Sequence, residues 1–134
     1  MVGFTSIMAV TALVSVKDCG AGKAAFNIRE LSISPTTVNP GDSLRLRMQY
    51  EVPQGLIVTG GTANYLVKYS FIPIPPTVES LCSNLPCPLG QGLYMNETVT
   101  TWPTGLTGPI TTTITWKDDS SKLLACFAID GKNI

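Results

Sequence analysis

The sequence contains no histidine and few charged side chains. Charged residues make up 13% of the 134 residues, about half the share of an average soluble domain. Without histidine, Ser-His-Asp and Cys-His triads and the commonest zinc ligand are excluded. Nine Lys and Arg residues balance nine Asp and Glu residues, so the chain lacks the basic surface that holds nucleic acid. We therefore expect no enzyme activity, no metal, no cofactor and no nucleic-acid partner.

The sequence also lacks an apolar run long enough to span a membrane. The stretch Met1–Val16 carries no charge, and its apolar core covers only Ile7–Val14, whereas a spanning helix needs about 20 apolar residues. Such a stretch is typical of a secretory signal, and Val10-Thr11-Ala12 offers small residues for cleavage. We predict a signal segment over residues 1–15 and one domain over residues 16–134. An ordered N-terminal strand is the alternative.

Helical periodicity is almost absent, and period-two alternation takes its place. Hydrophobic residues make up 44% of the chain, which excludes intrinsic disorder. Alternating apolar rows predict strands at 44–52, 65–71, 110–116 and 123–129, with weaker candidates at 26–34 and 93–102. Turn signals separate these rows, and neither a linker nor a repeat divides the chain. Six or seven such strands predict an all-β antiparallel sandwich. The pattern does not distinguish a filled core from a cavity between the sheets.

The sequon Asn96-Glu97-Thr98 lies in one of the weaker strand candidates. Asn96 is out of phase with Leu93, Met95 and Val99, which predicts that its side chain faces solvent. Asn96 is therefore a candidate N-glycosylation site if the chain is secreted. An unused surface asparagine is the alternative.

Four cysteines stand at positions 19, 82, 87 and 126. An even number behind an apparent signal segment predicts disulfides, and four cysteines allow three pairings. Cys82 and Cys87 lie in one loop rich in Pro and Ser, so local pairing is sterically easy and leaves Cys19 for Cys126. Closing the long loop between Cys19 and Cys126 is worth about 4–5 kcal/mol in the chain-entropy model.

Several segments of the sequence match the motifs of one protein family. Val14–Gly20, with its Lys-Asp-Cys-Gly, is similar to the family's mature start. Phe71–Pro76 and Cys82–Leu89, followed by Gly92, resemble its Pro-rich loop and its C…CP…G signature. Trp116–Cys126 resembles its last hairpin and closing cysteine. Together these segments resemble the ML lipid-recognition family, which includes the Niemann–Pick type C cholesterol-transfer protein, the ganglioside activator and fungal phosphatidylglycerol/phosphatidylinositol transfer proteins.

This resemblance implies an immunoglobulin-like sandwich whose sheets splay apart to admit one lipid. It also implies the pairs Cys19–Cys126 and Cys82–Cys87. Ile74 falls where the sterol-transfer branch has an entrance phenylalanine, Pro109 lies near that branch's Tyr-Pro, and Trp116 lies at its strand tryptophan. The stretch 34–41 replaces that branch's extra cysteine pair and reads more like the ganglioside-activator and phospholipid-transfer branches.

The function that these observations predict is lipid binding or transfer by burial of apolar surface. The protein would be secreted or would lie in the lumen of an endolysosomal or vacuolar compartment. Its partners would be a phospholipid or sterol, a transiently contacted membrane surface, and a protein partner in an extracellular or lumenal assembly. The alternative is a structural or recognition module of an extracellular assembly with a filled core.

We predict specific residues for the cavity and its mouth. The predicted lining is Leu46, Met48, Tyr65, Val67, Tyr69, Phe71, Val99, Ile114 and Trp116. The loops 72–76 and 101–109 are candidates for the gate. Trp102 would cap the mouth or dip into a membrane, because indole suits a boundary between apolar and wet surroundings.

Overall fold

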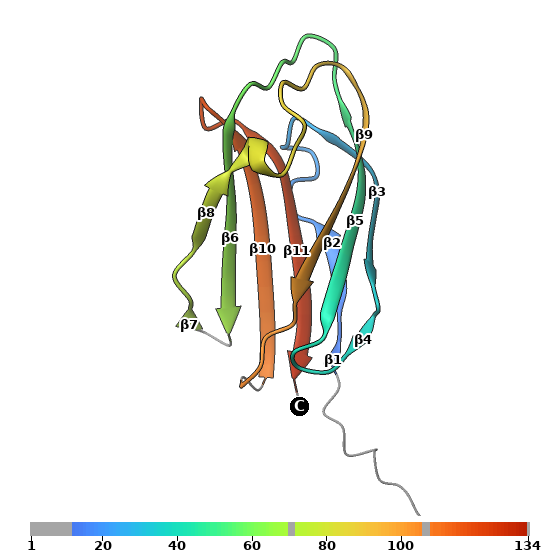
Figure 1. The fold of residues 1–134 in the computed structure, drawn as a ribbon, viewed down its shortest axis with the longest axis vertical. Coiled ribbons are helices and arrows are strands. Elements are labelled where there is room, and N and C mark those ends of the chain that lie inside the picture. Colours follow the sequence, from blue (N-terminus) through green and yellow to red (C-terminus); the bar gives the residue numbers. More distant parts are fainter. Residues whose placement is uncertain (1–11, 70–71, 106–107, 134) are drawn as a thin grey trace, which may run out of the picture.

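The computed structural model describes residues 12–69, 72–105 and 108–133, which form an all-β structure (Figure 1). Strand bounds are β1 (Ala12–Leu13), β2 (Ser15–Asp18), β3 (Asn27–Ser34), β4 (Thr37–Val38), β5 (Ser43–Val52), β6 (Gly61–Tyr69), β7 (Ile72–Pro73), β8 (Thr77–Ser80), β9 (Gly92–Thr101), β10 (Gly108–Asp118) and β11 (Leu123–Asn133). A short 3₁₀ turn, η2 (Leu81–Ser83), precedes β9. Within these ranges, no helix has the length and apolar character needed to cross a membrane.

Two antiparallel sheets face each other (Figure 1). The larger sheet has the order β2-β11-β10-β6-β7, with β8 also pairing with β6, and the smaller sheet has the order β3-β5-β9. The predicted all-β antiparallel sandwich is confirmed. The strands are more numerous than the seven expected, because short segments such as β1, β4 and β7 add to the long strands.

Strand β5 shows why the sequence folds in this way. Its even-numbered side chains are buried and its odd-numbered ones face outward, as period-two alternation requires. The buried residues are Leu44, Leu46, Met48, Tyr50 and Val52. Strand β10 follows the same rule and buries Ile110, Ile114 and Trp116. The sequence-based predictions for these two strands are therefore confirmed.

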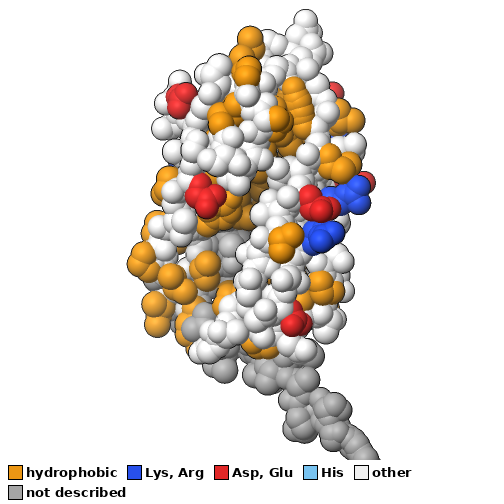
Figure 2. All heavy atoms as spheres, viewed as in Figure 1, with side chains coloured by type: hydrophobic (Ala, Val, Ile, Leu, Met, Phe, Trp, Pro, Cys, Tyr) orange, Lys and Arg blue, Asp and Glu red, His pale blue; other side chains and the backbone are white. Residues whose placement is uncertain are grey.

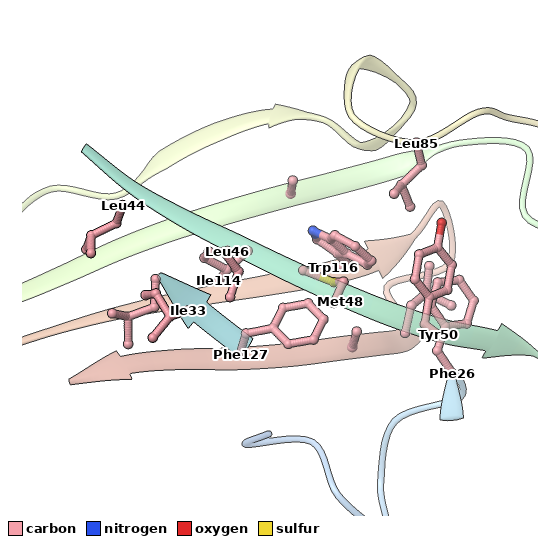
Figure 3. Close-up of a cluster of buried hydrophobic side chains, with 14 of the residues drawn as sticks. Phe26, Ile33, Leu44, Leu46, Met48, Tyr50, Leu85, Ile114, Trp116 and Phe127 are labelled. Atoms are coloured by element: carbon pink, nitrogen blue, oxygen red, sulfur yellow. The ribbon is translucent and has the colours of Figure 1, made fainter. Parts of the chain in front are cut away.

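An aromatic cluster fills one end of the space between the sheets (Figure 3). Phe26 stacks on Tyr50 with ring centroids 5.1 Å apart. Trp116 meets Tyr50 edge-on at 5.6 Å and Phe127 edge-on at 5.2 Å. Such edge-to-face pairs contribute about 0.5–1.5 kcal/mol each beyond the area they bury. This end of the sandwich is therefore a packed core.

Both predicted disulfides are present. Cys19 follows β2 and pairs with Cys126 of β11, whose carbonyl also accepts the Cys19 N–H at 3.0 Å. Cys82 and Cys87 close a short loop around η2. The first bond lies within the larger sheet and the second within a single connection. Neither disulfide joins the two sheets.

The folded unit begins before the predicted boundary at residue 16. Ala12 and Val14 are buried, and Ala12 lies opposite Val38 where β1 pairs with β4. The N–H of Val14 also donates to the carbonyl of Thr36 at 2.8 Å. Residues 12–15 therefore belong to the sandwich, whereas residues 1–11 of the predicted signal segment lie outside the described part of the chain.

Candidate functional site

A cavity of about 420 Å³ lies between the two sheets. Figure 2 shows the surface hollowed between the β6–β8 side and β9. This volume falls within the roughly 300–1,000 Å³ typical of small-molecule sites. The apolar lining residues are Leu46, Tyr65, Val67, Val99, Pro103, Ile114 and Ile129. The polar ones are Thr77, Glu79, Asn84, Thr98, Thr100, Thr101 and Thr112.

The floor of the cavity is apolar. Ile114 of β10, Ile129 of β11 and Leu46 of β5 line it, and all three side chains are buried. Val67 of β6 lies opposite Thr112 of β10 and extends the lining toward the edge of the larger sheet. An apolar ligand placed here would leave water at a gain of about 25 cal/mol per Å² buried.

Strand β8 brings polar side chains to one wall. Thr77 lies opposite Tyr65, and Glu79 lies opposite Ala63, both on β6. Directly opposite residues of an antiparallel pair share one face, and Ala63 and Tyr65 lie on the inward face of the larger sheet. Thr77 and Glu79 therefore face the cavity. Neither residue is predictable from the sequence pattern, because Pro73–Pro76 is typical of a loop.

The side chains of β9 that point toward the other sheet are not the ones that the sequence pattern predicts. Thr98 lies opposite Leu46 and Asn96 opposite Met48, and both β5 partners are buried. Asn96 and Thr98 are therefore on the inward face. The apolar residues of β9 are exposed instead, for example Val99 at 59%. The prediction that Asn96 faces solvent is wrong, because the side of β9 that faces the cavity is polar.

Five polar side chains, the polar cluster, lie together at one end of the cavity. Nδ2 of Asn84 donates to Oη of Tyr65 at 3.4 Å and to Oε1 of Glu79 at 3.2 Å. Nδ2 of Asn96 donates to the backbone carbonyl of Asn84 at 3.1 Å, and Oγ1 of Thr98 donates to Oδ1 of Asn96 at 3.0 Å. The cluster thus connects β6, β8, β9 and the η2 loop.

The charge of this end comes from one carboxylate. Glu79 is the only charged side chain among the described lining residues, which include no Lys or Arg. Burial raises the pKa of the Tyr65 hydroxyl, and the negative charge of nearby Glu79 raises it further. Tyr65 therefore stays protonated at neutral pH and can donate a hydrogen bond.

Four of the predicted lining residues turn their side chains to the cavity: Leu46, Tyr65, Val67 and Ile114. Val99 borders the cavity, but its side chain lies on the outward face of β9. Met48 and Trp116 are instead buried in the core and do not belong to the cavity wall. For Trp116 the reason is the aromatic cluster, which surrounds its ring.

The predicted entrance residues lie outside the lining. Tyr69 is half-buried, whereas Ile74 and Pro109 are exposed. The N–H of Ile74 donates to the carbonyl of Val67 at 2.9 Å, which holds Ile74 beside the strand that lines the cavity. Phe71 lies outside the described residues.

Of the two positions predicted for Trp102, capping the mouth or dipping into a membrane, the second is wrong. Its side chain is 1% exposed. A methyl group at Gly131 of β11 would come within 2.5 Å of the indole Cη2 and 2.9 Å of Val14. The absence of a side chain at Gly131 thus leaves the space that the indole fills.

The described residues contain no group of three or more His, Cys, Asp or Glu side chains that could hold a metal ion. The polar cluster has one carboxylate together with amide and hydroxyl groups. Its chemistry is that of a hydrogen-bonding site beside an apolar cavity.

Comparisons with known proteins agree with this architecture. A family model of the ML domain matches residues 13–132. A Dictyostelium discoideum protein that carries the name of a phosphatidylglycerol/phosphatidylinositol transfer protein is 27% identical over 117 residues, covering 84% of this chain and 82% of that protein.

Two solved structures share the fold. A Niemann–Pick type C2 protein from the Japanese carpenter ant has a TM-score of 0.62 at 11% identity, covering 87% of this chain and 96% of that one. Chicken MD-1, solved in complex with lipid IVa, has a TM-score of 0.57 at 15% identity, covering 91% and 90%. With the family model matching nearly the whole described chain, this protein belongs to the ML domain family.

Proposed function

We propose that this protein binds one lipid between its two sheets and carries it or presents it to a partner. The observation that carries this proposal is the cavity, with its buried apolar floor and its opening at the side of the sandwich. The family membership supports it. So do the name of the Dictyostelium relative, a phospholipid transfer protein, and the lipid IVa bound to chicken MD-1.

Binding needs no bond to form or break. The apolar part of the lipid would lie on Leu46, Ile114 and Ile129, where it leaves water at a gain of about 25 cal/mol per Å². The mechanism is therefore burial rather than catalysis. The polar end of the cavity would receive the part of the lipid that keeps its hydrogen bonds.

A transient contact with a membrane would deliver the lipid. Apolar side chains are exposed on and near the short strands beside the mouth, with Ile72 at 63%, Val78 at 58% and Ile74 at 38%. Figure 2 shows hydrophobic side chains gathered over this side of the molecule. We propose the loops 72–76 and 101–109 as the gate, since Thr101 and Pro103 line the cavity.

We also infer that the protein works in an oxidising compartment, outside the cell or in an endolysosomal or vacuolar lumen. Two disulfides use all four cysteines, and such bonds persist in oxidising surroundings. A removed signal segment within residues 1–15 remains a prediction. A glycan on Asn96 also remains a prediction, but the inward-facing amide, which is bonded to the Asn84 carbonyl, argues against it. Intact-mass analysis of the secreted product tests both.

Lipid extraction and mass spectrometry of the natively purified protein test the proposal directly. We expect one lipid per chain. A protein that carries no lipid and takes none up from vesicles would contradict the proposal. That result would favour the alternative of a structural or recognition module with a filled core.

Two cavity-filling variants locate the site. Val67→Trp and Ile114→Trp place an indole in the cavity and should abolish uptake of a fluorescent lipid from vesicles. Leu66→Trp is the matched control, because Leu66 is the neighbour of Val67 on β6 and is exposed. Folded variants, checked by circular dichroism, that all bind lipid like the wild type would show that this cavity is not the site.

A further inference from the structure

The polar cluster has both kinds of hydrogen-bonding group that a hydroxyl needs. A hydroxyl group donates one hydrogen bond and accepts others. Glu79 offers a carboxylate acceptor, and Tyr65 offers a protonated hydroxyl donor. Nδ2 of Asn84 bonds to both, at 3.2 Å and 3.4 Å, so the acceptor and the donor lie close together. The Tyr65 hydroxyl also bonds to the Glu79 carboxylate. One ligand hydroxyl placed between them, in exchange for this bond and the Asn84 contact, could bond to both.

The same cluster is unsuited to an anionic head group. Phosphate sites in proteins usually supply Arg or Lys to the phosphate oxygens. The described cavity lining has neither, and its one charged side chain is the carboxylate of Glu79. A phosphate beside Glu79 would therefore meet a like charge with no cation to offset it.

We propose that the cavity selects a lipid whose polar end is an uncharged hydroxyl group over a phospholipid with the same acyl chains, and that Glu79 is the residue that discriminates. The ligand hydroxyl donates to Glu79 and accepts from Tyr65, while the acyl chains lie on the apolar floor. This inference rests on the proposed lipid-binding function and specifies the class of lipid.

The placement of Glu79 supports a role in binding. Glu79 lies on β8, and its opposite neighbour, Ala63, has no polar side chain. Its carboxylate accepts side-chain hydrogen bonds from Asn84 and from the Tyr65 hydroxyl, and both partners line the cavity. Outside the cavity, by contrast, Arg45 and Glu97 form an ion pair at 3.6 Å on the outer face of the smaller sheet. Glu79 is exposed to solvent at the wall of the cavity, and its two described partners there, Asn84 and Tyr65, are both uncharged.

A matched pair of ligands tests this selection. Dioleoylglycerol and dioleoylphosphatidic acid share their acyl chains and differ only in the phosphate group. With each fluorescently labelled on an acyl chain and offered from neutral vesicles, we expect the wild-type protein to prefer dioleoylglycerol by about tenfold or more, because juxtaposed like charges oppose the phospholipid.

Three variants assign the preference to the cluster. Glu79→Gln should reduce it, and Glu79→Lys should reverse it in favour of the phospholipid. Tyr65→Phe should weaken binding of dioleoylglycerol and leave that of the phospholipid unchanged. Glu30→Gln is the control, because Glu30 is exposed on β3 in the other sheet, and it should bind like the wild type.

The outcomes separate the two proposals. If the wild-type protein binds neither lipid, nor any other lipid, the proposed function fails and this inference fails with it. If both lipids bind equally well and Glu79→Lys changes nothing, the inference is overturned while the proposed function stands. Circular dichroism of each variant confirms that a loss of binding is not a loss of fold.

Discussion

Tyr50 stands at the centre of the aromatic cluster, fully buried, and its hydroxyl has no hydrogen-bond partner within the described part of the chain. A buried polar group without a partner costs about 1–3 kcal/mol. Tyr50→Phe keeps the ring contacts and removes that group. We therefore expect it to raise the free energy of unfolding by about 1–2 kcal/mol, measured by urea denaturation.

Tyr94→Phe is the control for this prediction. The Tyr94 hydroxyl donates to the carbonyl of Gly90 at 2.9 Å. Its removal should lower the free energy of unfolding by about 1 kcal/mol. If Tyr50→Phe were as destabilising as Tyr94→Phe, the Tyr50 hydroxyl would have a favourable interaction and the interpretation would be wrong.

The same hydroxyl makes stability depend on alkaline pH. Burial, and next the charge of Tyr94, raise the pKa of Tyr50 from 10.0 to about 12 in the folded protein. Below pH 10 the hydroxyl is protonated in both the folded and the unfolded states. Between pH 10 and 12 the unfolded chain loses this proton first, so the free energy of unfolding falls as pH rises. Denaturation measured across this range should show a smaller fall for Tyr50→Phe than for the wild type.

At the scale of the elements, the two disulfides should contribute unequally to stability. Cys19 and Cys126 are separated by 107 positions, whereas Cys82 and Cys87 are separated by 5. In the chain-entropy model, removing the first should cost about 4–5 kcal/mol and removing the second about 2 kcal/mol. Urea denaturation of the two Cys→Ser double variants checks this order. An equal loss in both would contradict it.

Strands β5 and β9 show which elements the sequence could predict. In β5 the alternation correctly predicted which side chains point inward, because its apolar side chains pack in the core. The same reasoning assigned the two faces of β9 the wrong way round. Its inward residues Asn96 and Thr98 form part of a polar cavity wall, and its apolar residues face outward. Alternation identifies a strand and its two faces. It assigns the inward face correctly only where that face is apolar.

The apolar residues of the site could be predicted from the sequence, and its polar residues could not. Leu46, Val67 and Ile114 followed from the apolar rows, whereas Glu79 and Asn84 did not, because they enter the cavity through the pairing of β8 with β6 and through the η2 loop. The burial of Trp102 could not be predicted either, since it depends on the absence of a side chain at Gly131 in a distant strand.

At the scale of the whole molecule, a bound lipid should stabilise the fold. A ligand that binds only the folded state adds about 2.7 kcal/mol to the free energy of unfolding at 100 times its Kd. Thermal denaturation of the delipidated protein with and without lipid should therefore show a higher Tm with lipid. Val67→Trp, with its cavity filled, should show no such shift. A shift of equal size in that variant would place the lipid elsewhere.

The path of the two disulfides has a mechanical consequence. In antibody domains a disulfide links one sheet to the other. In this protein neither disulfide crosses the space between the sheets. Among the described residues, only chain connections and side-chain packing link the two sheets. The cavity opens between edge strands of the two sheets. Neither disulfide therefore fixes the distance between the two sheets, and side-chain packing alone sets it across the cavity.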